Sequence, residues 1–196
     1  QIRQIQEVIP SKRQNILFSA TFPARVERLA DEFLLWPTRI EVTPQSTPVA
    51  TVEQFKLALP NLRTKIAFVE WFVRERLGEE RLLVFARKKE DAENLSRFLQ
   101  RTFDMGVRAI HSNKGQNSRI NAMQEFRTGT VQILIATDVA SRGIDVPETS
   151  MVINASAPRD PHDYIHRIGR TGRAFRNGTA LTLYDSAERF AMERIE

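Results

Sequence analysis

The segment HRIGRTGR, residues His166–Arg173, places three arginines and two glycines within eight positions of the chain. Glycine has no Cβ, so Gly169 and Gly172 allow the chain to turn tightly and a ligand to approach the backbone closely. Arg170 and Arg173 lie three positions apart beside these glycines, and their planar guanidinium groups offer donors that match phosphate oxygens. The segment therefore indicates a phosphate-binding loop, with a solvated turn rich in arginine and glycine as the alternative.

A second polar segment, TDVASRGID at Thr137–Asp145, directly follows an apolar run. The Thr137 hydroxyl and neighbouring backbone N–H groups offer donors to one backbone phosphate, and Arg142 offers a charge to a second. Asp145 only accepts hydrogen bonds when ionised, so it suits a sugar hydroxyl and repels a phosphate. The alternative is a helix N-terminus capped by Thr137 or Asp138.

A third segment, HSNKGQNSR, places Gln116 and Arg119 at i and i+3, on the same side of the first turn of a predicted helix. The free N–H groups and the dipole of a helix N-terminus attract anions, which makes this turn a candidate phosphate contact. An ordinary cap by Asn113 followed by a solvated Arg119 is the alternative.

The segment LFSATFP places Ser19 and Thr21 directly after a predicted buried strand at residues 15–20. Two uses suit small hydroxyl side chains at this point. They either cap the following helix or donate hydrogen bonds to a neighbouring lobe.

Composition narrows the class of protein. The chain has 196 residues, 41% of them hydrophobic, which suffices for one domain or for one domain and part of another. It has no cysteine, no apolar run long enough to predict a membrane span, and a net charge of +5 that favours a polyanionic partner such as nucleic acid. The three histidines share no metal-ligand spacing, and the sequence contains no G-x-x-x-x-G-K-[ST] loop and no catalytic triad. By itself the chain holds half an active site.

The elements that must position these residues alternate between short apolar runs and amphipathic segments, as in a parallel α/β sheet. We expect strands at residues 15–20, 38–43, 52–59, 81–86, 107–110, 131–137, 150–155 and 179–185. We expect helices at residues 23–36, 62–73, 92–99, 119–126 and from 187 onward. Residues 44–51, PQSTPVAT, predict a linker. Ligands gather at the carboxyl ends of parallel strands, so we expect the polar loops, including the region leading into HRIGRTGR, along one edge.

In chain order, five motifs resemble those of the DEAD-box RNA helicases: SAT (19–21), LVFARKK (83–89), Gln116 with Arg119, ATDVASRGID (136–145) and YIHRIGRTGR (164–173). That family has two RecA-like lobes that close over ATP and single-stranded RNA. The resemblance implies that residues 1–43 are the tail of the first lobe, 44–51 the interlobe linker and 52–196 the second lobe. The second lobe would be a RecA-like parallel sheet with helices on both faces. The ending looks most like the bacterial RhlE-type branch.

The resemblance also implies how ATP would be bound. The phosphate loop and the Asp-Glu-Ala-Asp carboxylates would lie upstream of residue 1, and that lobe would hold most of ATP and Mg²⁺. Arg170 and Arg173 resemble arginine fingers that reach the γ-phosphate, where a finger is worth about 10³–10⁵ in rate. Asp145 would accept the ribose hydroxyl, and Gly143 would let the backbone approach.

Two further roles follow from the same resemblance. His166 resembles the residue that couples nucleotide to RNA, with Ser19 and Thr21 as its partners when the lobes close. The residues that would grip the RNA backbone are Gln116, Arg119, Thr137, Arg142 and Lys88. Single-stranded or duplex RNA would then bind with little sequence preference in a cytoplasmic protein that is inactive without its upstream lobe.

Three departures from the family pattern concern the RNA-contacting loops. Lys88 stands where the family usually has threonine, His111-Ser112-Asn113 replaces His-Gly-Asp, and Ser156 in NASAP replaces an acidic residue. These changes leave open a second hypothesis, a non-catalytic RNA-binding or adaptor module with a helicase fold. A DNA helicase lobe is a third.

Overall fold

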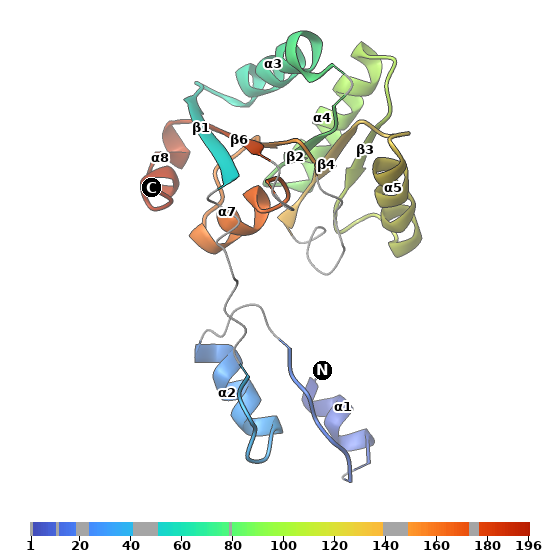
Figure 1. Ribbon diagram of the computed structural model, residues 1–196, viewed down its shortest axis with the longest axis vertical. Coiled ribbons are helices and arrows are strands. Elements are labelled where there is room, and N and C mark those ends of the chain that lie inside the picture. The colour runs from blue at the N-terminus through green and yellow to red at the C-terminus, as the bar shows by residue number, and fades with distance from the viewer. Residues whose placement is uncertain are drawn as a thin grey trace. The chain divides into compact units, whose positions relative to one another are not determined.

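The computed structural model describes residues 2–10, 12–18, 24–40, 51–78, 80–138, 149–172 and 177–196. The chain divides into two compact units, Gln1–Gln45 and Ser46–Glu196. Figure 1 shows both units, each of which is described by itself here. The division falls inside the predicted linker.

The described part of the first unit contains two helices, α1 (Ile2–Val8) and α2 (Ala24–Phe33), and no strand. The helix expected at residues 23–36 corresponds to α2. The strand predicted at 15–20 is wrong for residues 15–18, where Phe18 is 90% exposed. The strand predicted at 38–43 is wrong for residues 38–40, which are also exposed. A strand requires a neighbour for its N–H and C=O groups, and the described residues of this unit provide none.

The second unit is built on a six-stranded parallel sheet with the strand order β1-β6-β5-β2-β4-β3. Each strand lies within a residue or two of its predicted range. The strands are β1 (Val52–Ala58), β2 (Leu82–Phe85), β3 (Val107–Ile110), β4 (Ile133–Ala136), β5 (Met151–Asn154) and β6 (Gly178–Tyr184). The sequence therefore predicted the sheet of this unit correctly.

Helices cover both faces of this sheet (Figure 1). On one face lie α3 (Leu62–Phe72), which continues into a π-helical turn at Val73–Leu77, and α4 (Lys89–Thr102). On the other face lie α5 (Gln116–Thr128) and α7 (Pro161–Ile168). The predicted RecA-like layering is confirmed.

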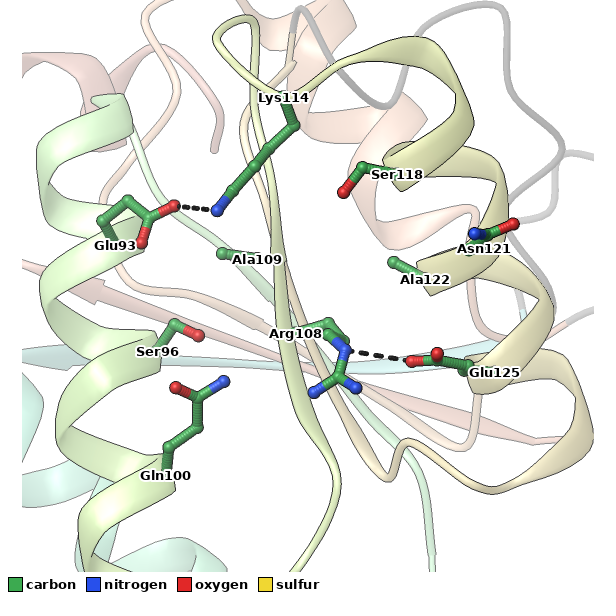
Figure 2. A pocket seen from close by; sticks show the side chains of 10 residues that line it. All are labelled: Glu93, Ser96, Gln100, Arg108, Ala109, Lys114, Ser118, Asn121, Ala122 and Glu125. Atoms are coloured by element: carbon green, nitrogen blue, oxygen red, sulfur yellow. Dashed lines mark ion pairs between the residues drawn. The ribbon is translucent and has the colours of Figure 1, made fainter.

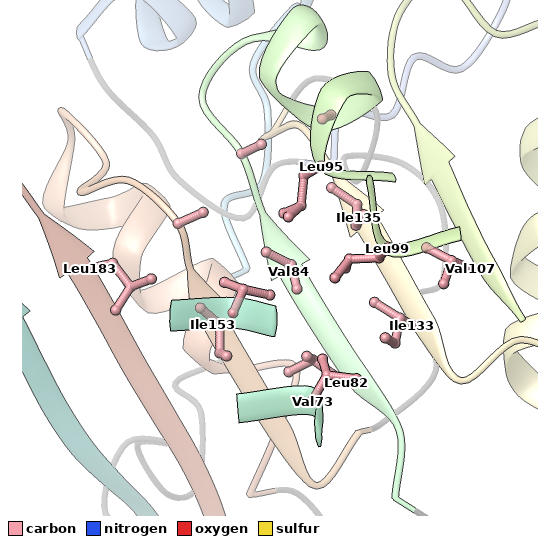
Figure 3. Packing of buried hydrophobic residues seen from close by; sticks show 14 of the residues in the cluster. Val73, Leu82, Val84, Leu95, Leu99, Val107, Ile133, Ile135, Ile153 and Leu183 are labelled. Atoms are coloured by element: carbon pink, nitrogen blue, oxygen red, sulfur yellow. The ribbon is translucent and has the colours of Figure 1, made fainter. Parts of the chain in front are cut away.

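Successive side chains of the central strand β2 point to opposite faces of the sheet, which explains this layering. Leu82 and Val84 pack with Leu99 of α4 in one apolar cluster, which Figure 3 shows. Leu83 and Phe85 belong to a second cluster on the opposite face, which includes buried residues of α5. Because both faces are buried, the four residues of β2 are all apolar and the strand reads as a continuous apolar run.

The chain end differs slightly from its prediction. The helix expected from residue 187 onward is a 3₁₀ turn at Ser186–Glu188 followed by α8 (Arg189–Glu193). Asp185 caps the turn by accepting the Ala187 N–H group at 3.0 Å.

Helix α7 was not predicted, since its residues were interpreted as a loop. Pro161 occupies the first turn, where its missing N–H group costs nothing, and the Asp160 carboxylate accepts the His162 N–H group at 2.9 Å. The first three residues of HRIGRTGR are therefore helical. Of the two glycines, Gly172 has φ +70° whereas Gly169 has φ −66°, so only Gly172 needs the freedom of glycine.

Candidate functional site

The carboxyl ends of the six parallel strands bring several predicted residues to one edge of the sheet. Lys88 follows β2, and it is exposed at the N-cap of α4. Gln116 and Arg119 lie in the first turn of α5, which follows β3, and the Arg119 guanidinium donates to the Gln116 side-chain oxygen at 3.1 Å. Thr137 directly follows β4. The structure therefore brings these four predicted RNA-contacting residues to the same edge.

Helices α4 and α5 begin differently from α3 and α7. Asn61 and Asp160 cap α3 and α7 with their side chains, whereas the N-caps of α4 and α5, Lys88 and Gly115, make no side-chain cap hydrogen bond. The alternative in which Asn113 caps α5 is wrong. The first N–H groups of α4 and α5 lie where an anion can accept from them.

Thr137 and Asp138 have separate surroundings at the end of β4. Thr137 is 7% exposed, and its N–H group donates to the Ile110 carbonyl at 3.2 Å. The carboxylate of Asp138 accepts two hydrogen bonds from Arg167, at 2.7 and 2.8 Å. Asp138 thus forms a bidentate ion pair with α7.

Arg167 is a buried arginine of α7 that sequence reasoning missed. It is 2% exposed, and besides its ion pair it donates to the Asn154 side-chain oxygen at 3.2 Å and to the Ser156 carbonyl at 3.0 Å. Its guanidinium lies 5.2 Å from the centre of the Phe85 ring. One buried arginine therefore joins α7 to the carboxyl ends of β2, β4 and β5. Helical spacing from Tyr164, which is also buried, was the signal that could have found it.

The region that leads into HRIGRTGR, residues 155–160, follows β5 at the carboxyl edge as expected, whereas the arginine-rich turn itself lies at the opposite edge. Its residues contact the amino-terminal side of β5. The Arg170 carbonyl accepts the Thr149 N–H group at 3.1 Å, and the Thr171 hydroxyl donates to the Ser150 carbonyl at 2.9 Å. Helix α7 thus begins near one edge of the sheet and delivers Arg170 toward the other.

His166 lies on the last turn of α7, and Arg170 lies in the turn that follows the helix. His166 is exposed and Arg170 is half-buried, and the Arg170 Nε donates to the His166 carbonyl at 3.2 Å. The other predicted site residues lie outside the described part of the chain. They are Ser19, Thr21, Arg142, Gly143, Asp145 and Arg173.

A second buried cation was also missed. Lys65 of α3 is 3% exposed, its ammonium lies 3.1 Å from an Asp185 carboxylate oxygen, and it also pairs with Glu188. The sequence places Lys65 120 positions from Asp185, so nothing local indicates the pair. This cluster attaches α3 to the segment after β6.

Glu93 of α4 accepts two hydrogen bonds, from Lys114 at 2.6 Å and from His111 at 2.7 Å. The Lys114 hydrogen bond, followed by that of His111, lowers the pKa of the Glu93 carboxyl below its ordinary value. Within the described ranges, no group of three or more His, Cys, Asp or Glu side chains is placed to hold a metal ion. None of the helices there is both long and apolar enough to cross a membrane.

The family of helicase conserved C-terminal domains matches residues 64–175, more than half of the chain. The chain belongs to this family. DEAD-box ATP-dependent RNA helicase 40 of Oryza sativa is 36% identical to it, over 100% of this chain and 25% of the relative. DEAD-box ATP-dependent RNA helicase CshA of Bacillus subtilis is 33% identical, over 100% of this chain and 39% of the relative. The helicase chain thus spans much less than two thirds of the length of these curated relatives.

Solved structures agree with this assignment. S. cerevisiae Dbp5 bound to RNA and ADP BeF3 is similar with a TM-score of 0.79 and 29% identity, over 98% of this chain and 50% of that one. The E. coli DEAD-box protein SrmB, bound to regulator of ribonuclease activity A, has a TM-score of 0.67 and 32% identity, over 74% and 84%. The second unit is therefore the RecA-like C-terminal domain of a DEAD-box RNA helicase.

Proposed function

We propose that this chain is part of an ATP-dependent RNA helicase that acts together with an upstream ATP-binding lobe. In this proposal residues 1–43 end the first lobe, residues 44–51 link the lobes and residues 52–196 form the second lobe. One observation carries the proposal. Lys88, Gln116 and Arg119 gather at the N-termini of α4 and α5, whose N-cap side chains make no cap hydrogen bond, in a chain similar to Dbp5, whose structure was solved with RNA.

The RNA backbone would bind along the carboxyl edge of the sheet. The first N–H groups of α4 and α5 offer donors, and Lys88 and Arg119 offer charges, to phosphates of one strand. Thr137 and Arg142 would contact neighbouring phosphates. Such contacts fix the position of the strand without reading its bases, which gives little sequence preference. A contact to the 2′-hydroxyl would distinguish RNA from DNA.

The nucleotide would lie against the turn that follows α7. Arg170 and Arg173 would stabilise the charge that spreads over the γ-phosphoryl group during transfer, and Gly143 and Asp145 would receive the ribose. Arg170 fits this role because its half-buried guanidinium extends from a turn that β5 holds in place. ATP supplies the phosphoryl group, and Mg²⁺ would be held mainly by the upstream lobe.

Lobe closure would link hydrolysis to RNA. His166 is exposed on α7 one turn before Arg170, so a partner surface can reach both side chains together. We assign Ser19 and Thr21 as the partners of His166. Closing the lobes around one bent strand would then separate a short duplex locally. We further assign the protein to the cytoplasm and to the RhlE-type branch.

The decisive experiment measures RNA-stimulated ATPase after this chain is mixed with a separately produced upstream lobe. We expect turnover only in the mixture, and none from either piece alone with or without RNA. Turnover by this chain alone would contradict the proposal. RNA binding that ignores both nucleotide and the other lobe would favour the non-catalytic RNA-binding or adaptor module instead.

A further inference from the structure

Glu93 connects the two helices that present the predicted RNA contacts. It lies in the second turn of α4, five positions after Lys88, and one of its carboxylate oxygens receives both the Lys114 ammonium and the His111 ring Nε2. His111 and Lys114 belong to the loop between β3 and α5, which leads directly to Gln116. We call the set of Glu93, His111 and Lys114 the Glu93 latch.

The latch determines how the loop folds. The His111 ring is nearly buried, and its Nδ1 accepts the Asn113 N–H group at 3.3 Å, so the Nε2 carries the proton that it donates to Glu93. The His111 carbonyl in turn accepts the Lys114 N–H group at 3.0 Å. The Glu93 carboxylate on α4 therefore orients the His111 ring, and this ring in turn accepts a hydrogen bond from the loop backbone.

Side-chain packing does not join α4 to the start of α5 at this point. A hollow of about 470 Å³ lies between the two helices beside the edge strand β3, and Figure 2 shows Lys114 reaching across its upper part to Glu93. Ser96 of α4 and Ser118 of α5 line the hollow, and their small side chains leave it open. Open space replaces apolar contact here, so polar contacts join the start of α4 to the loop before α5. They are the Glu93–Lys114 ion pair and a hydrogen bond of 3.5 Å from the Lys89 ammonium to the Asn113 side-chain oxygen.

We propose that Glu93 is a positioning residue for RNA binding, which holds the first turn of α5 at a fixed place relative to Lys88. This inference rests on the proposed function, since it assigns a purpose to the spacing of the two uncapped helix N-termini. The carboxylate also engages the Lys114 ammonium within the protein. RNA phosphates then meet Lys88 and Arg119 rather than a third, freely moving cation.

The test compares Glu93→Gln with Glu90→Gln. Both variants remove one negative charge from α4, but Glu90 is an exposed residue whose carboxylate lies 3.8 Å from the neighbouring Lys89 and makes no contact with the latch. Added positive charge by itself strengthens RNA binding. A weaker affinity in Glu93→Gln alone therefore cannot come from the charge.

Two readouts separate the steps of the inference. On this chain alone, amide hydrogen exchange at Asn113 and Lys114 should become faster in Glu93→Gln and stay unchanged in Glu90→Gln. With the upstream lobe, a non-hydrolysable ATP analogue and a fluorescent oligouridylate, the Kd of Glu93→Gln should rise about three- to tenfold. Lys114→Met should raise it similarly, and the double variant should add little, because both changes open one latch.

Arg119→Ala distinguishes failure of this inference from failure of the proposed function. If Arg119→Ala weakens RNA binding while Glu93→Gln leaves it unchanged or tightens it, the positioning role is wrong and the RNA role of the turn stands. If Arg119→Ala has no effect, the RNA role of this turn is wrong and the inference falls with it. Unchanged amide exchange at Asn113 and Lys114 in Glu93→Gln would show that the Glu93 latch does not order this loop, whatever the RNA affinity of the variant.

Discussion

Two parts of the second unit, the corner around α7 and the starts of α4 and α5, hold their cations in opposite ways. At the α7 corner, Arg167 is buried, its guanidinium binds a carboxylate, an amide and a carbonyl, and it covers an aromatic ring. At the starts of α4 and α5, Lys88 is exposed and Gln116 is exposed, and the backbone N–H groups beside them have no side-chain cap.

This difference shows how one domain can hold two ligands with different demands. A phosphoryl-transfer site needs a charge at a fixed place, and a buried, fully hydrogen-bonded arginine can keep α7 in that place. A backbone-binding edge needs accessible donors that tolerate any base sequence. Arg167 and Arg170 lie three residues apart in one motif, so the same short segment supplies both the buried support and the half-buried charge.

The largest effect should come from Arg170, the half-buried arginine in the turn after α7. Arg170→Ala should lower RNA-stimulated turnover about 10³-fold or more, which is about 4 kcal/mol of transition-state stabilisation, and leave ATP binding largely intact. The measurement is steady-state ATPase of the chain with its upstream lobe. Arg101→Ala, which removes an exposed arginine at the end of α4, is the control and should match wild type. Equal turnover for both variants would rule out the finger role.

Removing the buried arginine should affect folding first. Arg167→Ala removes the hydrogen bonds that the guanidinium donates to the Asp138 carboxylate, the Asn154 side-chain oxygen and the Ser156 carbonyl. Loss of one partner of a buried ion pair costs about 3–5 kcal/mol. Urea denaturation should show this loss in the free energy of unfolding, whereas Arg101→Ala should stay within about 0.5 kcal/mol of wild type. A loss below 1 kcal/mol would mean that α7 is held by its apolar contacts instead.

The glycine after Arg170 tests how tightly the turn is packed. A Cβ at Gly172 would lie 2.6 Å from the Val52 Cγ2 atom and 3.0 Å from the Thr51 Oγ1 atom. Gly129 also has a positive φ, but a Cβ there meets nothing within 4 Å. Gly129→Ala should therefore cost about 1 kcal/mol of backbone strain and Gly172→Ala about 2–3 kcal/mol, as measured by thermal unfolding. Equal losses of stability in Gly172→Ala and Gly129→Ala would show that Val52 and Thr51 move aside easily for the added methyl group.

At the carboxyl edge the expected effects are smaller, because each contact is one of several. Lys88→Ala should weaken RNA binding a few-fold at low salt for every RNA sequence. The slope of log K against the logarithm of the salt concentration should also fall in magnitude by about one. Lys56→Ala makes the same charge change on edge strand β1, where the ammonium pairs with Glu196, and should leave RNA affinity unchanged. Anisotropy titrations over a range of salt concentrations measure both. Equal losses of RNA affinity in the two variants would mean that Lys88 contributes only through the net charge of the protein.

The smallest effect concerns pH. Lys114 and His111 lower the pKa of Glu93 in the folded chain below its ordinary value of 4.5. The carboxylate therefore adds stability above pH 4.5, and this contribution disappears as the pH falls through the lower, folded value. The difference in unfolding free energy between wild type and Glu93→Gln should be below about 1 kcal/mol at pH 7 and vanish at acidic pH. A difference that grows on acidification would contradict this assignment.

Much of the second unit was predictable because the signal is local. The apolar runs of β2 and β4 mark strands buried on both faces. In α4, Ala92, Leu95 and Leu99 recur at helical spacing, and all three are buried. The motif order also placed Lys88, Gln116 and Arg119 at the carboxyl edge, since a parallel sheet leaves its loops there.

The sequence by itself thus determined the element types of the second unit apart from α7, the loops that could carry chemistry and the family. Only the tertiary structure decided the strand order, the burial of Arg167 and Lys65, and the place of Arg170 beside β5. It also decided that residues 15–18 form no strand, although three of the four are apolar. The physical reason is the same in each case. Strand pairing and the burial of a charge depend on partners far away in the chain, whereas periodicity and capping depend on neighbours within a few residues.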